Sequence, residues 1–390
     1  MGTDHDPDTS KPKLSRNARG KLARRIINQT IPAILRSTPI ARRGVEAVEL
    51  ILDPPPPQRP STTGSVKETR PPPRRRVNND IITDQKVEDV VPSSTAQPLP
   101  PTASVMGDDE NKRHNLSLVV EDTLRAAHGL HRRNLAASGE HHRRRLGILN
   151  MASPLRPGGG VLSGATSQEE SLCRRTTLYP SLREEFYRLP EVGGIFTPNV
   201  LVFNVDFKDE REQLSQSSGH QVKVQDERKE WFYVDVITAA MLRFPDTGGG
   251  EETCYAEDKD RELVVKKMVA VMRILKAKGV EQVVLGAWGC GAYGNPIGEI
   301  ARAWRKVLLG HRRRPPPPPG KGKANKLAEE SEMWRDIEVV FAIKDARMAR
   351  VFAKAFGPEL QVLQDEAGAA VDQDDSEENE VVSDVDSASS

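Results

Sequence analysis

Two adjacent carboxylates, Glu169 and Glu170, follow a run of three glycines, Gly158–Gly160, after a short spacer. Carboxyl groups can donate and accept protons, and glycines let a backbone approach a ligand closely. A carboxylate beside a bound phosphate is repelled by it unless it takes part in the chemistry, for example as a proton donor at a glycosidic bond. This stretch is therefore the first candidate for a catalytic site.

The same residues also have a purely structural interpretation. Ser167 with Glu170, or Thr166 with Glu169, matches the capping box found at the start of a helix. Composition alone favours this explanation over catalysis. It does not account for both carboxylates, however, because adjacent residues of a helix point about 100° apart. One glutamate can cap the helix while its neighbour faces the glycine loop.

A second glycine-rich stretch, residues 289–296, follows the apolar run that ends at Trp288. Backbone N–H groups in such a loop, with a helix start behind them, can bind phosphate oxygens. Tight turns explain either glycine stretch equally well by itself, and neither has the spacing of a P-loop or a Rossmann fingerprint. Two such loops in one domain suggest a diphosphate that is held from two sides.

Apolar strands alternate with amphipathic helices around these loops. The strand patterns cover residues 116–120, 146–150, 200–205, 231–238, 280–288 and 337–343. One helical pattern starts at Asp122 or Thr123. Four others cover residues 168–187, with a break at Pro180, and residues 257–278, 297–309 and 346–356. This alternation predicts an α/β fold with a mostly buried sheet, in which ligands bind at the carboxyl ends of the strands.

The rest of the chain has a different composition. We expect residues 1–13 to be disordered, 14–50 to form an N-terminal helical element, and 53–111 to be a proline-rich disordered linker. The α/β domain would span residues 112–358, with an insertion at 311–330 that contains five consecutive prolines. Residues 359–390 would form an acidic disordered tail.

Charge and cysteine usage indicate the environment. The net charge is only +1, yet basic clusters lie in the first part of the chain and acidic residues gather near its end. Three scattered cysteines argue against a disulfide framework, and no run is typical of a membrane span or a secretory signal. We therefore expect an intracellular monomer, cytoplasmic or nuclear.

Other candidate groups are weaker. The histidines between residues 128 and 142 have no cysteine or carboxylate to complete a usual metal site, and a solvated basic run is favoured. Cys290 has no histidine partner, so we interpret it as a packing residue. Tyr293 lies between glycines and could stack on a sugar or base. The sequence therefore predicts neither a metal nor a cofactor.

The glycine and glutamate motifs resemble the signature of the microbial-type poly(ADP-ribose) glycohydrolases. The matching residues are Asn150-Met-Ala-Ser-Pro-Leu-Arg-Pro-Gly-Gly-Gly160 and Gln168-Glu169-Glu170-Ser-Leu-Cys173-Arg174, with similar family segments at 236–240 and 285–291. The resemblance covers about residues 112–358, with a weaker helical match near 14–50. It implies a three-layer α/β/α, macrodomain-like fold with a mixed central sheet that binds ADP-ribose.

The resemblance also implies a role for each site residue. Glu170 would be the catalytic acid/base, and Glu169 would orient the ribose. Gln168 would support the catalytic loop, and Asn150 would contact the terminal ribose. The loop residues would be Gly158, Gly159 and Gly160 in the catalytic loop, and Gly289, Gly291 and Ala292 around the diphosphate. Tyr293 stands where related enzymes usually have phenylalanine.

The implied reaction is hydrolysis of ribose–ribose O-glycosidic bonds, with poly(ADP-ribose), ADP-ribose and ADP-ribosylated proteins as partners. Residues 202–206 and 241–244 depart from the family pattern. These departures concern the residues that would contact the adenine and leave the catalytic assignment unchanged. Two other functions remain open: a macrodomain that binds ADP-ribose without cutting it, and a nucleic-acid-associated scaffold that uses the basic segments. Neither nucleic acid nor a membrane is required by the enzymatic interpretation.

Overall fold

The computed structural model describes residues 14–56, 115–138, 144–205, 230–249, 253–310 and 334–363. Its main sheet contains, in spatial order, β1 (Glu49–Leu52), β4 (Gly193–Val202), β5 (Phe232–Ala239), β3 (Leu146–Met151), β8 (Gln282–Leu285), β9 (Glu338–Ala342), β2 (Leu116–Val119) and β10 (Gln361–Leu363). β4 is antiparallel to both β1 and β5, whereas every other neighbouring pair is parallel. The predicted mixed sheet is therefore confirmed.

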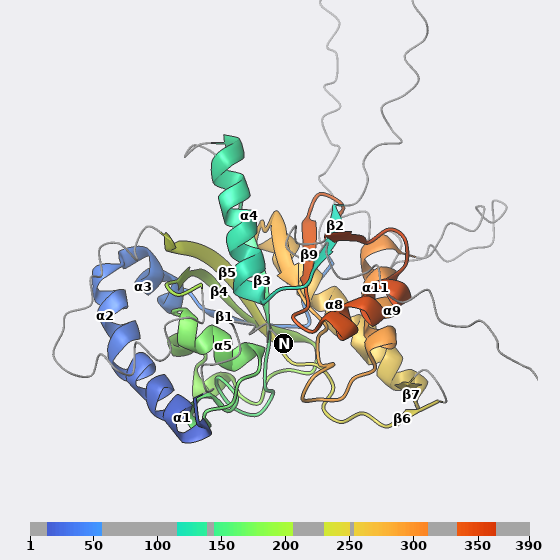
Figure 1. The fold of residues 1–390 in the computed structure, drawn as a ribbon, viewed down its shortest axis with the longest axis horizontal. Coiled ribbons are helices and arrows are strands. Elements are labelled where there is room, and N and C mark those ends of the chain that lie inside the picture. Colours follow the sequence, from blue (N-terminus) through green and yellow to red (C-terminus); the bar gives the residue numbers. More distant parts are fainter. Residues whose placement is uncertain are drawn as a thin grey trace, which may run out of the picture. The chain divides into compact units, whose positions relative to one another are not determined.

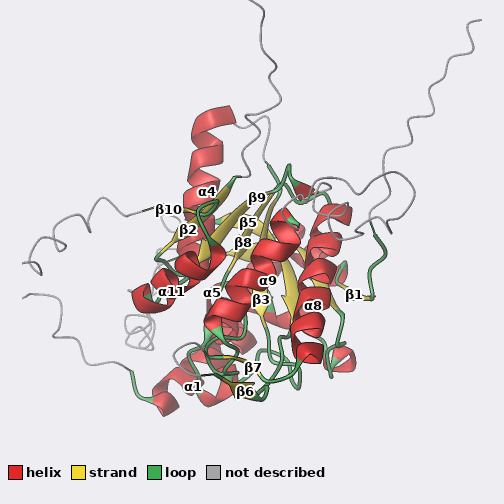
Figure 2. Ribbon diagram, turned by 90° about the vertical axis from the view of Figure 1, so that its right-hand side faces the viewer, coloured by secondary structure: helices red, strands yellow, loops and turns green. Residues whose placement is uncertain are grey.

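Helices cover both faces of this sheet (Figures 1 and 2). One face carries α4 (Thr123–Ser138) and α5 (Gln168–Arg175), and the other carries α8 (Asp258–Ala277), α9 (Ile297–Leu309) and α11 (Ala346–Phe356). Adjacent residues of β3 illustrate the arrangement. Ile148 packs in the core beneath α4 and α5, whereas Leu149 packs in the core beneath α8, α9 and α11. The three-layer α/β/α architecture is thus as predicted.

The N-terminal segment forms the predicted helical element. It consists of α1 (Arg16–Arg25), a π-helical turn η1 (Ile26–Thr30), α2 (Ile31–Ser37) and α3 (Pro39–Glu46). Ser15 caps α1 by accepting a hydrogen bond from the Ala18 N–H. The chain breaks at Thr38 because the residue before a proline is disfavoured in helical geometry, and Pro39 then starts the next helix.

The sheet is wider than the sequence patterns indicate. β1 and β10 were not predicted, and β4 begins at Gly193 rather than at residue 200. Gly193 and Gly194 were missed because glycines usually mark turns. Here the neighbouring strand requires a glycine, since a Cβ on Gly194 would lie 2.5 Å from the Thr238 carbonyl oxygen.

The helix predicted at 168–187 is shorter than expected. α5 ends at Arg175, and two 3-10 turns follow, η3 (Tyr179–Ser181) and η4 (Glu184–Phe186). Thr176 already pairs with Val202 as an isolated β-bridge, and the Thr177 hydroxyl accepts from the Leu201 N–H. Backbone contacts with β4 therefore replace the helical hydrogen bonds well before Pro180.

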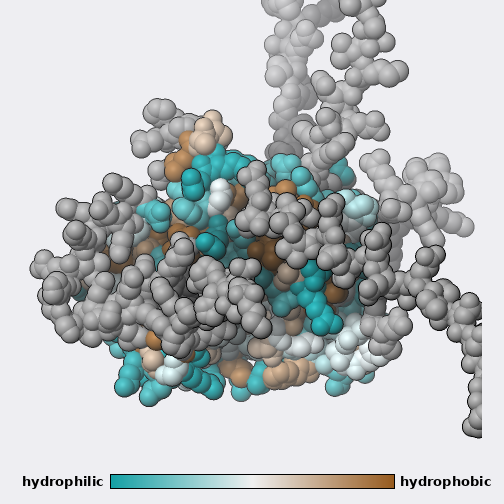
Figure 3. Space-filling view, viewed as in Figure 1, coloured by the Kyte–Doolittle hydropathy of each residue, from teal (hydrophilic) through white to brown (hydrophobic). Residues whose placement is uncertain are grey.

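The segments predicted to be disordered, 1–13, most of 53–111, the insertion at 311–330 and most of 359–390, lie outside the described residues. Across the described part of the chain, no helix combines the length and apolar character needed to cross a membrane. In the space-filling view, the lower left edge, where Figure 1 places α1, is mainly hydrophilic (Figure 3).

Candidate active site

Glu169 and Glu170 lie in the first turn of α5 and are almost completely buried, with exposed fractions of 3% and 6%. Ser167 is the N-cap residue, but its side chain makes no capping hydrogen bond. Neither capping box proposed from the sequence is formed, because both carboxylates point toward the loop between β3 and α5 instead. The structural explanation for this pair is therefore wrong.

Backbone amides of that loop hold one oxygen of each carboxylate. The Gly160 N–H donates to Glu170 Oε1 and the Ser153 N–H donates to Glu169 Oε2, both at 2.8 Å. Each of these hydrogen bonds ties one carboxyl oxygen to the loop backbone. The loop thus fixes both side chains.

Glycine is required in this loop by the carboxylates themselves. Gly159 has a φ of 55°, and a Cβ there would lie 2.7 Å from Glu170 Oε1 and 2.9 Å from Glu169 Oε2. A Cβ on Gly158 would meet the Tyr179 ring at 2.8 Å, and one on Gly160 would meet Ala165 Cβ at 2.8 Å. The three glycines therefore let the loop close over the glutamates.

Gln168 connects this helix start to the sheet. Its Oε1 accepts from the Met151 N–H at 2.9 Å, and its Nε2 donates to the Leu149 carbonyl at 2.7 Å. Both groups belong to the end of β3, beyond the last residue pair between β3 and β8, Ile148 and Val284. The Gln168 amide therefore takes the place of a strand partner at the end of β3.

Asn150 lies at the end of β3 with no exposed surface, and its Nδ2 donates to Thr238 Oγ1 of β5 at 3.2 Å. The adjacent Thr238 therefore determines which way the Asn150 amide is turned. Its Oδ1 is buried without a hydrogen-bond partner in the described chain.

The second glycine loop is built around Asn295, which the sequence analysis did not single out. Asn295 Nδ2 donates to the carbonyls of Leu242 and Gly289, and its Oδ1 accepts from the Tyr255 hydroxyl at 2.8 Å. Gly289 has a φ of 82°, and a Cβ there would lie 2.5 Å from Asn295 Nδ2. The sequence feature that could have identified Asn295 is its position directly before Pro296, at the end of a glycine loop.

The middle of this second loop faces outward. Gly291 and Ala292 are exposed, and a Cβ on Gly291 would meet no atom within 4 Å. Their backbone is therefore accessible to a ligand. The fold brings these residues to the same edge of the sheet as Gly158–Gly160, because β3 and β8 are parallel neighbours.

Tyr293 joins the two loops. Burial raises the pKa of its hydroxyl, and a hydrogen bond with Ser153 of the first loop opposes that shift. The charges of Glu169 and Glu170 also raise this pKa, which places the Tyr293 side chain within electrostatic range of both. Its ring is half-buried and contacts Phe244 edge-on, with a centroid distance of 6.2 Å.

Burial changes the protonation of the glutamate pair. It raises the pKa of Glu169 from 4.5 to about 8, the negative charge of Glu170 adds to the rise, and the Ser153 N–H opposes it. Glu169 is therefore protonated at neutral pH. A carboxylic acid retained near pH 7 is available for proton transfer or as a hydrogen-bond donor.

This pKa predicts a pH dependence of stability. Between pH 4.5 and about 8 the folded protein keeps a proton on Glu169 that the unfolded chain has released. Its contribution to the unfolding free energy is complete below the lower value and falls by about 1.4 kcal/mol per pH unit as the pH rises through this window. Urea unfolding at several pH values should show that Glu169→Gln removes this slope, whereas the exposed-site control Glu262→Gln keeps it. Parallel profiles for the wild type and Glu169→Gln would contradict the assignment.

Several buried polar atoms at the site have no hydrogen-bond partner among the described residues. They are Asn150 Oδ1, Glu169 Oε1, Glu170 Oε2 and the Tyr187 hydroxyl. An unpaired buried polar group is costly and is usually satisfied by something that binds there. Three of the four belong to residues that the sequence analysis placed at a sugar. Tyr187, whose pKa is raised by burial and then by Glu169, was missed because it lies in an irregular segment.

The weaker candidates that the structure describes have structural roles, whereas His141 and His142 lie outside the described residues. The rings of His128 and His131 stack on Phe232, with centroid distances of 5.5 and 4.9 Å. Cys290 packs against the core, and burial raises the pKa of its thiol to about 12. Over the described ranges, no three His, Cys, Asp or Glu side chains gather as they would around a metal ion.

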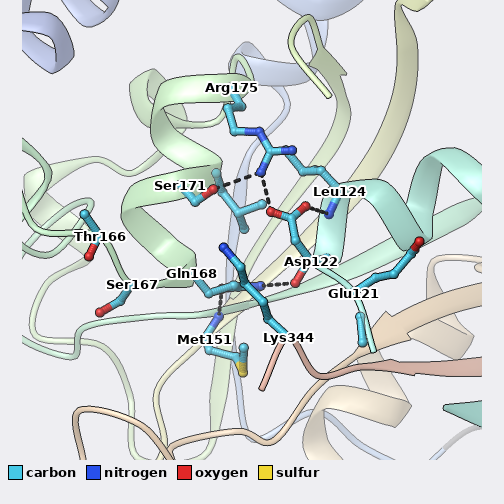
Figure 4. A pocket seen from close by; sticks show the side chains of 13 residues that line it. Glu121, Asp122, Leu124, Met151, Thr166, Ser167, Gln168, Ser171, Arg175 and Lys344 are labelled. Atoms are coloured by element: carbon cyan, nitrogen blue, oxygen red, sulfur yellow. Dashed lines mark hydrogen bonds and ion pairs between the residues drawn. The ribbon is translucent and has the colours of Figure 1, made fainter. Parts of the chain in front are cut away.

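Gln168 is among the residues that line a cavity of about 170 Å³ (Figure 4). Its walls come from the ends of β2, β3 and β9 and from the start of α5. Asp122 caps α4 by accepting from the N–H groups of Leu124 and Arg125, and it pairs with the buried Arg175. Gln168 thus lines this cavity and directly precedes the glutamate pair in the sequence.

Comparisons with known proteins agree with the motif analysis. The model of the family described as microbial-type PARG, catalytic domain, matches residues 77–204, which include Asn150, the first glycine loop and both glutamates. No curated protein matches the chain.

Solved structures of poly(ADP-ribose) glycohydrolases are similar to the chain. A mutant of the Thermomonospora curvata enzyme is 27% identical, over 62% of this chain and 78% of that chain, with a TM-score of 0.41. The same enzyme bound to the inhibitor ADP-HPD is 21% identical over 86% and 99%, with a TM-score of 0.47. The Deinococcus radiodurans enzyme in complex with ADP-ribose is 24% identical over 63% and 84%, with a TM-score of 0.40.

Proposed function

We propose that this chain, whose residues 77–204 belong to the microbial-type PARG catalytic-domain family, is a poly(ADP-ribose) glycohydrolase in which Glu170 is the acid and base. The bonds that it hydrolyses are the ribose–ribose O-glycosidic bonds of the polymer, and the product is ADP-ribose. The observation that supports a catalytic site here is the pair of buried carboxyl groups, each with one oxygen held by a loop amide and one without a partner. The choice of Glu170 within the pair follows the resemblance of Gln168-Glu169-Glu170 to the family signature.

The geometry suits proton transfer from Glu170 to a sugar oxygen. The Gly160 N–H occupies Oε1, so Oε2 is the atom that remains for the substrate. Substrate phosphates and the exclusion of water both favour protonated carboxyl groups. The protonated Glu170 gives its proton to the leaving 2′-oxygen as the bond from the anomeric carbon to that oxygen breaks.

The second half of the reaction uses the same carboxylate. An oxocarbenium-like ribose is attacked at the anomeric carbon by water, and Glu170 accepts the proton that the water releases. The ribose gains a hydroxyl group, the shortened polymer gains a proton on its 2′-oxygen, and Glu170 returns to its starting state. Every atom in this sequence comes from the substrate, water and Glu170.

The neighbouring groups hold the sugar. Glu169, protonated at neutral pH, can donate a hydrogen bond to a ribose oxygen, and the unpartnered Asn150 Oδ1 can accept one from a ribose hydroxyl. Tyr293 contributes an aromatic side chain beside both loops. We assign ribose orientation to Glu169 and Asn150 on these grounds.

The second loop is assigned to the diphosphate. Gly291 and Ala292 present exposed backbone at the edge of the sheet where the glutamates lie. Amide groups in such a loop can hold phosphate oxygens without a metal or a charged side chain.

The experiment that tests this function incubates the purified full chain with poly(ADP-ribose) and, separately, with a mono-ADP-ribosylated protein. We expect free ADP-ribose from the polymer, identified by chromatography and mass spectrometry. If the chain binds ADP-ribose but releases none from polymer, it is a reader of ADP-ribose rather than a hydrolase.

A further inference from the structure

We propose that helix α1 is a positioning element of the active site, and that Arg19 and Gly20 hold the glycine loop in the form that supports the two glutamates. This inference rests on the proposed function, because it concerns how the same loop is kept in place. Arg19 and its loop partner Gly164 are 145 residues apart in the sequence. From the sequence alone, the N-terminal helices are predicted to be a separate element.

The backbone of α1 lies directly on the loop at two glycines. A Cβ on Gly20 would lie 2.9 Å from the Leu162 carbonyl oxygen, and a Cβ on Gly164 would lie 2.0 Å from the Arg16 carbonyl oxygen. These residues belong to α1 and to the short 3-10 turn η2 (Val161–Ser163) with its cap. The contact therefore leaves no room for a side chain on either side.

Two arginines fasten the same contact. Arg16 Nε donates to the Ser163 carbonyl at 3.1 Å, and Arg19 Nε donates to the Gly164 carbonyl at 2.9 Å. Hydrogen bonds from a charged donor are stronger than those between neutral groups. The end of the loop between β3 and α5 is thus held by α1, which is not adjacent to that loop in the sequence.

The contact is linked to the glutamates through the loop itself. The Ala165 N–H donates to the Gly160 carbonyl at 3.1 Å, and Arg174 of α5 donates to the Ala165 carbonyl at 3.0 Å. The N–H of the same Gly160 donates to Glu170 Oε1. A shift of Leu162 or Gly164 therefore moves the amide that orients the proposed acid.

Gly20→Ala separates positioning from stability. Alanine favours a helix more than glycine does, but its Cβ would push on the Leu162 carbonyl, which is backbone and cannot rotate away. We expect kcat on poly(ADP-ribose) to fall about tenfold to a hundredfold, as misplacements of about 1 Å do, without a lower melting temperature. The matched control is Gly129→Ala in α4, where a Cβ meets no atom within 4 Å; its kcat should stay unchanged.

Three further variants test the role of Arg19. Arg19→Ala should lower kcat more than KM rises, Arg19→Lys should restore part of the loss, and Arg24→Ala on the exposed surface of the same helix should have no effect. Because a loss of fold would remove activity and ADP-ribose binding together, the dissociation constant for ADP-ribose is measured for every variant.

The outcomes distinguish this inference from the proposed function. If Glu170→Gln is inactive but Gly20→Ala and Arg19→Ala match their controls in kcat, the positioning role is wrong and the function stands. If Glu170→Gln keeps wild-type activity, the proposed function fails first. A fall in kcat for Gly20→Ala at an unchanged or higher melting temperature supports the positioning role.

Discussion

Glu170→Gln is expected to lower kcat on poly(ADP-ribose) by about 10³-fold while the affinity for ADP-ribose stays within a few fold. Loss of a group that acts as both acid and base removes a catalytic contribution of about 10² to 10⁴. The substitution preserves the fold, because a glutamine oxygen can still accept the Gly160 N–H. Its amide nitrogen replaces Oε2, the oxygen without a partner.

The measurement compares initial rates of ADP-ribose release with binding measured by calorimetry. Glu262→Gln is the matched control, since Glu262 is an exposed glutamate on α8. Equal turnover by Glu170→Gln and the wild type would rule out Glu170 as the acid. Loss of both binding and the folded state would instead point to a supporting role for this carboxylate.

Gly159→Ala is expected to have the second largest effect, lowering kcat by about 10²-fold. The new Cβ would lie within 3 Å of an oxygen of each glutamate, so both carboxyl groups must move away from their loop amides. The positive φ of 55° adds a strain of about 1–2 kcal/mol for any residue with a Cβ. The variant should therefore be less active and less stable.

Gly279→Ala isolates the strain from the clash. Gly279 has a φ of 71°, and a Cβ there meets no atom within 4 Å. It should show the backbone strain in urea unfolding but a normal kcat. If Gly159→Ala retains the activity of this control, the glycine loop is not what holds the glutamates in place.

Much of the fold follows from local patterns. The alternation of apolar strands and amphipathic helices predicted the layers, and five of the predicted strands lie within about two residues of β2, β3, β5, β8 and β9, apart from a longer prediction for β8. These strands are buried and parallel, so their apolar runs are continuous. β1 and β10 lie at the edges of the sheet and carry no such signal, since edge strands are short and partly exposed.

Residue types and spacing in the sequence determined the chemistry at this site: two adjacent carboxyl groups at a helix start, preceded by glycines, with a second glycine loop after another strand. Only the tertiary structure decided how these groups act. It gave the carboxylates loop amides in place of capping bonds, raised the pKa of Glu169 by burial, joined the loops through Tyr293, and placed α1 on the loop end. The physical reason is that desolvation and close backbone contact depend on segments distant in sequence, which no local pattern contains.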